Sequence, residues 1–104
     1  MSGDAPLGTF EEQVLLAILR TREEAFGMAV RREIERVTGR DVAIGAVYAT
    51  LDRLEAKGLV TSDRTRSQAG RRVFTVTRRG AAALAESRAM RERLWRGVDV
   101  RGLL

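Results

Sequence analysis

The sequence predicts a mainly α-helical fold with one small β-hairpin. Apolar residues recur at the three- and four-residue spacing of amphipathic helices over most of the chain. That period gives way to short β-prone segments only between residues 59 and 77. The chain has 104 residues, of which 44% are hydrophobic, so we expect a single domain with a modest core.

The first helix is expected to start near Thr9. A threonine followed three residues later by Glu12 has the pattern of a capping box. The apolar stripe that follows consists of Phe10, Val14, Ala17 and Ile18. The polar segment 20–24 predicts the turn that ends this helix.

Two further helices are predicted over residues 25–38 and 43–57. In the first of them, Phe26, Val30, Ile34 and Val37 recur at helical spacing, and Gly39 is a stop signal. The second of them ends at Gly58. Its predicted core side carries Ile44, Val47, Tyr48, Leu51, Leu54 and Glu55, and its predicted outer side carries Ala46, Ala49, Thr50, Arg53, Ala56 and Lys57.

Residues 59–64 and 72–77 are rich in β-branched and aromatic side chains and predict a hairpin with a basic tip. A last helix follows over residues 78–97, with Thr77 as its N-cap. Three helices, a hairpin and a long helix form the order of a winged helix-turn-helix. We therefore expect a winged helix-turn-helix over residues 1–77 and a C-terminal dimerisation helix over residues 78–104, in one continuous fold.

Cysteine and histidine are both absent from the chain. Disulfides, thiol chemistry, Cys/His zinc sites and a histidine base are therefore excluded, and no glycine-rich phosphate loop or facing carboxylate pair is evident. We expect no enzyme, no cofactor and no metal. No apolar run is long enough for a membrane span, and residues 1–6 lack the pattern of a signal peptide, so we expect no membrane association and a cytoplasmic location.

The net charge of +5 is concentrated in one part of the chain. Residues 1–60 carry eight basic and ten acidic side chains, whereas residues 61–80 carry six arginines and one aspartate. Codon bias in a GC-rich genome accounts for much of the excess of arginine over lysine, but it does not account for where the charge lies. A basic patch on a near-neutral body predicts a polyanionic partner, here double-stranded DNA.

The candidate DNA-binding residues lie on the third helix and on the hairpin. Small side chains on the helix let its backbone approach the floor of a major groove, and the hairpin arginines suit phosphates or the minor groove. The alternatives are a solvated helix face and a hairpin tip charged for solubility. The candidates are Ala46, Tyr48, Ala49, Thr50, Arg53, Lys57, Arg64, Arg66, Arg71 and Arg72.

The end of the last helix is too apolar for a free, solvated helix. Met90, Leu94, Trp95 and Val98 predict a homodimer interface, which places two recognition helices on a palindromic site. Packing on the chain's own first helix is an alternative. A ligand pocket around Trp95, as in a multidrug-type sensor, is another.

Four stretches resemble the PadR-like transcriptional regulators, namely residues 8–19, 24–34, 45–60 and 70–80. The third is similar to the family's Tyr-x-x-Leu-x-x-Leu-Glu-x-x-Gly-Leu core, from Tyr48 to Leu59. The fourth resembles its wing, with Phe74 where tyrosine is common. The resemblance covers about residues 7–96 and implies a repressor that dimerises through its C-terminal helix and is released from DNA by a small molecule. A winged helix used for protein–protein contact is the main alternative.

Overall fold

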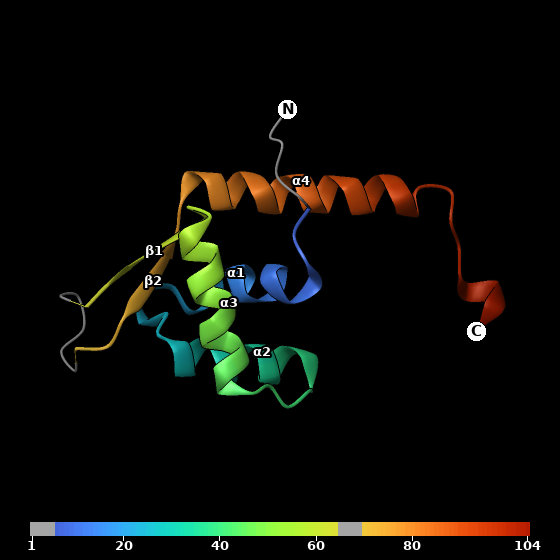
Figure 1. Ribbon diagram of the computed structural model, residues 1–104. Helices are drawn as coiled ribbons and strands as arrows, with labels where there is room; N and C mark the ends of the chain where they lie inside the picture. Colours follow the sequence, from blue (N-terminus) through green and yellow to red (C-terminus); the bar gives the residue numbers. More distant parts are fainter. Residues whose placement is uncertain (1–5, 65–69) are drawn as a thin grey trace.

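The computed structural model describes residues 6–64 and 70–104 and confirms the predicted fold class. Three helices come first, α1 (Thr9–Thr21), α2 (Gly27–Thr38) and α3 (Ile44–Ala56), with a 3-10 turn at Arg22–Glu24 between α1 and α2. The antiparallel strands β1 (Val60–Asp63) and β2 (Val73–Val76) follow, and then α4 (Arg78–Trp95) and a 3-10 turn at Arg101–Leu103. In the view of Figure 1, α1 lies between α2 and α4, and α3 runs across α1 from near the start of α4 to α2.

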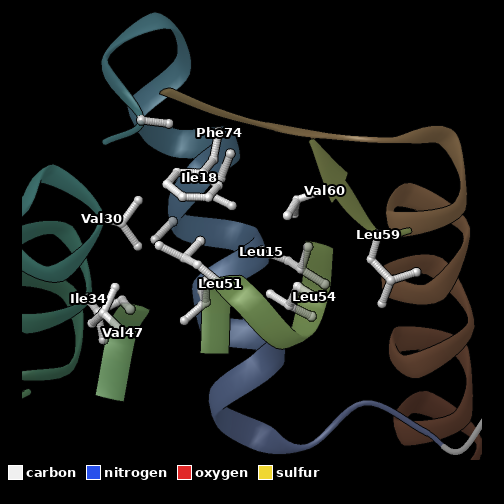
Figure 2. Close-up of a cluster of buried hydrophobic side chains, with 13 residues drawn as sticks. Leu15, Ile18, Val30, Ile34, Val47, Leu51, Leu54, Leu59, Val60 and Phe74 are labelled. Carbon is white, nitrogen blue, oxygen red and sulfur yellow. The ribbon is translucent and has the colours of Figure 1, made fainter. Parts of the chain in front are cut away.

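The core lies where α1, α2, α3 and the hairpin meet (Figure 2). Leu15 and Ile18 of α1 are enclosed by Val30 of α2, Leu51 of α3 and Phe74 of β2, all of which are buried. Burial of such side chains contributes about 1.5–3 kcal/mol each, so this cluster stabilises the arrangement of α3 relative to the hairpin.

The helix α1 begins at Thr9 as predicted, but its N-cap lies one residue earlier than expected. Gly8 is the N-cap, and its backbone N–H donates to Glu11 Oε1 at 2.9 Å, so the capping box predicted from Thr9 and Glu12 is wrong. Glu12 instead forms an ion pair with Arg91 of α4. Glycine is tolerated at the N-cap position, and Glu11 supplies the capping acceptor there.

The N-terminus of α4 confirms the prediction for Thr77. Its Oγ1 accepts from the Gly80 N–H at 3.1 Å and donates to the Gly58 carbonyl at 2.7 Å. A Cβ on Gly80 would lie 2.2 Å from the Leu59 carbonyl oxygen, so only glycine fits this junction. Gly80 weakens the helix by propensity, and its close packing against Leu59, the residue before β1, explains its presence.

The far end of α4 extends beyond the body of the protein, opposite the hairpin (Figure 1). Leu94, Trp95 and Val98 are 71%, 58% and 53% exposed, while Met90 is partly buried. Packing of this end on the chain's own first helix, one of the alternatives, is therefore wrong. Within residues 6–64 and 70–104, no helix has the length and apolar character needed to cross a membrane.

Candidate nucleic-acid interface

The exposed face of α3 is built from very small side chains. Gly45, Ala46, Ala49 and Ala56 are all exposed, and Gly45 has no neighbouring atom within 4 Å of where a Cβ would stand. Val47, Leu51 and Leu54 hold the opposite face of the helix in the core. The buried face of α3 is thus packed against the core, and no large side chain covers the backbone at the centre of its exposed face.

The predicted position of Thr50 on this outer face is wrong. Thr50 is only 2% exposed, and its hydroxyl accepts from Arg53 Nη2 at 3.1 Å. It lies three residues from Val47 and four from Leu54, so it shares their buried side. Arg53 itself is exposed at the edge of the face.

Tyr48 borders the exposed face on the side of α2. Its ring lies directly against Gly27, where a Cβ would come within 2.4 Å of Tyr48 Cζ. The residue is 39% exposed, so it closes the α2–α3 contact while part of it faces the solvent. This position is compatible both with the predicted place on the core side of α3 and with a contact to DNA.

A basic hollow of 680 Å³ lies between the start of α2, Tyr48 and the hairpin residues that follow β1 and precede β2. The guanidinium of Arg71 lies 4.3 Å from the centroid of the Phe26 ring, and Arg64 Nη1 donates to the Gly70 carbonyl at 3.0 Å. Arg32 of α2, which the sequence analysis did not select, also lines the hollow. The full lining is Phe26, Met28, Arg32, Tyr48, Arg64, Gly70, Arg71 and Arg72.

Two of the predicted basic residues are engaged in ion pairs. Lys57 Nζ lies 2.9 Å from Glu11 Oε2, and this contact, after the hydrogen bond from the Gly8 N–H, helps to hold the pKa of Glu11 below its usual value. Arg72 is bound more extensively. Its Nη1 lies 3.2 Å from Asp52 Oδ1 and its Nη2 lies 2.7 Å from Glu55 Oε1.

The hairpin lies beside α3 (Figure 1), and the structure brings Tyr48, Arg64, Arg71 and Arg72 together around one hollow. Arg66 falls in residues 65–69, outside the described residues. Asp52 and Arg32 were missed by the sequence analysis. The carboxylate of Asp52 does not add to the positive charge that predicts DNA contact. Arg32 lies on α2, outside the third helix and the hairpin, to which the predicted contacts belong.

Comparisons with known proteins agree with this geometry. Residues 15–86 match the model of the transcriptional regulator PadR-like family. The transcriptional regulator Rv3488 of Mycobacterium tuberculosis is 42% identical over 76 residues, which cover 72% of this chain and 70% of that protein.

Solved structures share the fold. RosR of H. salinarum superposes with a TM-score of 0.72 at 25% identity, over 91% of this chain and 83% of RosR. A PadR family transcription regulator from Clostridium difficile gives a TM-score of 0.58 at 23% identity, over 84% and 88% of the two chains. The chain therefore belongs to the PadR-like family of transcriptional regulators, and it has the winged helix-turn-helix fold of a DNA-binding protein.

Proposed function

We propose that this protein binds double-stranded DNA with α3 in a major groove and the hairpin along the neighbouring backbone. The observation that supports this most directly is the row of small side chains on α3 beside the basic hollow. A helix without bulky side chains approaches base edges closely, and guanidinium groups next to it meet the flanking phosphates.

Within the interface, each class of residue has a different task. Ala46 and Ala49 line the contact with the bases, and Arg53 at the edge contacts a guanine or a phosphate. Tyr48, Arg64 and Arg71 contact phosphates, together with Arg32, which adds a charge from α2. Lys57 lies at the end of α3 and exchanges Glu11 for a phosphate when DNA is bound.

Salt dependence of binding tests this proposal. We expect the affinity for the promoter DNA upstream of the gene to fall steeply with salt, because each phosphate contact releases condensed counterions. Arg71→Ala and Arg32→Ala should each weaken binding and reduce the magnitude of the logarithmic salt slope by about one. Arg88→Ala is the matched control, since Arg88 is an exposed arginine on α4 that pairs with Glu92. Unchanged binding by both hollow variants would contradict this interface.

The protein is further proposed to act as a homodimer through the far end of α4. Met90, Leu94, Trp95 and Val98 supply the apolar surface, and three of these are more than half exposed. A two-fold dimer presents two copies of α3, which suits a palindromic operator with half-sites about 34 Å apart. In this arrangement residues 1–77 form the DNA-binding unit and residues 78–104 the dimerisation element.

Repression is the regulatory outcome that we propose, because occupancy of an operator within a promoter blocks access of the polymerase. The protein would act in the cytoplasm, where bacterial and archaeal promoters lie. A reporter gene behind the bound promoter tests the sign of regulation: deletion of the regulator should raise expression, and a fall would identify an activator.

A small-molecule effector that releases the DNA is the second part of this proposal. The exposure of Trp95 supports a site near the dimer interface, where two copies of this ring come close. Titration of the dimer with a panel of aromatic acids and cations should quench tryptophan fluorescence and lower operator affinity together. Quenching without a change in affinity would contradict a regulatory role.

A further inference from the structure

The exposed face of α3 contains one side chain with hydrogen-bonding atoms at its centre. The four buried residues of α3 are Val47, Thr50, Leu51 and Leu54. With about 100° between successive residues, the direction opposite these buried residues runs through Gly45, Ala49, Asp52 and Ala56, and Arg53 lies to one side of it. Three of the four residues in this direction have nothing beyond a methyl group. Asp52 is therefore the group that meets the base edges first if α3 enters a major groove.

Asp52 is held in place and electrostatically compensated by Arg72. Arg72 Nη1 lies 3.2 Å from Asp52 Oδ1, while Nη2 contacts Glu55 Oε1 at 2.7 Å. The guanidinium also lies 4.8 Å from the centroid of the Phe74 ring, and Ser62 Oγ, 3.5 Å from Nη2, donates to Glu55. Because Arg72 has partners on α3 and on both strands, it fixes the carboxylate of Asp52 and offsets its repulsion from phosphates.

The carboxylate of Asp52 retains acceptor capacity toward the solvent, since its side chain is 63% exposed. An ionised carboxylate only accepts hydrogen bonds. In the major groove guanine presents acceptors and thymine an acceptor and a methyl group, whereas the amino group of cytosine is an unaccompanied donor. Adenine has an amino group too, but its N7 acceptor lies beside it and repels a carboxylate.

We propose that Asp52 determines sequence specificity by accepting a hydrogen bond from the amino group of a cytosine, and that Arg72 is its positioning residue. This inference rests on the proposed placement of α3 in the major groove. It gives Arg72 a task different from the phosphate contact expected from the sequence. The other outcome is that Asp52 only anchors the hairpin through Arg72 and touches no base.

Selection from a randomised duplex library distinguishes these outcomes. The wild-type dimer, Asp52→Ala and Asp52→Asn are each used to enrich bound sequences, and the enriched pools are compared position by position. The wild type should prefer cytosine about tenfold at one position of the selected site. Asp52→Ala should lose that preference and leave the other positions unchanged, and Asp52→Asn should shift it toward adenine, whose N6 and N7 an amide matches.

Glu55→Gln and Arg72→Ala complete the experiment. Glu55→Gln removes the other carboxylate that contacts Arg72 and lies outside the exposed row, so it should keep the cytosine preference. Arg72→Ala should reduce that preference severalfold at the same position, because the carboxylate loses its fixed orientation. Circular dichroism and thermal unfolding check that each variant is folded.

Two results would overturn the inference in distinguishable ways. If the wild type enriches a site but Asp52→Ala and Asp52→Asn enrich the same site with the same preferences, Asp52 contacts no base, while DNA binding by α3 stands. If the wild type enriches no sequence from the library, the proposed function itself fails and the inference fails with it.

Discussion

The middle of α3 and the far end of α4 are both exposed helical surfaces, but they are built from opposite kinds of side chain. The exposed face of α3 has glycine, alanine and one aspartate at its centre, with Tyr48 and Arg53 at its edges, whereas the far end of α4 exposes Leu94 and Trp95. The two surfaces are also separate in space, because the far end of α4 extends beyond the body of the protein, away from α3 (Figure 1). One chain therefore carries two interfaces with different chemical requirements.

The difference indicates which kind of partner each surface suits. Burying large apolar side chains away from water is favourable, so the end of α4 suits contact with an apolar protein surface. Small side chains gain little from dehydration, but they let a backbone approach a deep and hydrated groove. Exchanging the character of the two surfaces should therefore damage two separate activities.

The largest effect is expected at α4. Trp95→Glu places a charge at the centre of the proposed dimer interface, and such positions contribute at least about 2 kcal/mol. We expect the dimer dissociation constant, measured by sedimentation equilibrium, to rise at least about thirtyfold. The helical signal in circular dichroism should be unchanged, because Trp95 is largely exposed within its own protomer.

Ala81→Glu is the control for this variant. Ala81 is exposed in the first turn of α4, at the end next to the hairpin, so the same charge is added far from the proposed interface. This variant should dimerise like the wild type. A monomeric wild-type protein, or equal dissociation constants for all three proteins, would contradict the contrast between the two surfaces.

The next effect is expected on α3. Ala49→Leu adds a branched side chain to the exposed face and should lower operator affinity about tenfold or more by holding the helix away from the bases. Its free energy of unfolding should stay within about 0.5 kcal/mol of the wild-type value, because exposed leucine and alanine are both good helix formers. Fluorescence anisotropy of labelled operator and urea unfolding measure the two quantities.

The larger features of the fold followed from the sequence because each has a local cause. Hydrophobic periodicity set the helices, Thr77 capped α4 as expected, and Gly39 ends α2 in the left-handed conformation. The start of α1 near Thr9 was predicted correctly, but its N-cap is Gly8 rather than Thr9, with Glu11 rather than Glu12 as the glutamate that reaches back. Two adjacent glutamates both fit the local pattern, so the sequence alone does not decide between them, and Glu12 instead pairs with the distant Arg91.

The site was less predictable, because its decisive contacts are tertiary. Thr50 was misplaced because it stands at the margin of the helical face, where packing rather than periodicity decides burial. The charge of Arg72 alone predicts a phosphate contact, which stays a prediction, but it does not predict the ion pairs of this residue. Its pairing with Asp52 and Glu55 arises only when β2 lies beside α3, twenty and seventeen residues away in sequence.

A smaller effect, on stability, is expected from Gly27→Ala, which tests the contact that holds the Tyr48 ring at the edge of the α3 surface. The added methyl group would meet the Tyr48 ring at 2.4–2.6 Å, so the ring must swing outward. We expect a loss of about 1–2 kcal/mol in the free energy of unfolding, measured with urea. Gly45→Ala is the matched control, since its Cβ meets nothing and the change should stabilise α3 by up to about 1 kcal/mol. Equal effects of the two substitutions would mean that the Tyr48 contact is not formed.

The smallest effect concerns the α1–α2 side, away from both surfaces. Hydrogen bonds from Arg36 and then Arg20 to the Glu33 carboxylate lower the pKa of Glu33 to about 2. Because this pKa is below the unfolded value of about 4.3, the stabilisation is complete above pH 5 and is lost as the pH falls toward 2.

The comparison of wild type with Glu33→Gln isolates this contribution from that of the other carboxyl groups. The wild-type melting temperature should exceed that of the variant near pH 7, and the difference should shrink between pH 5 and pH 2. Operator affinity and dimerisation at neutral pH should be equal in the two proteins, because Glu33 contacts neither α3 nor the end of α4. A constant difference in melting temperature across this range would show that the ion pairs of Glu33 are not formed in solution.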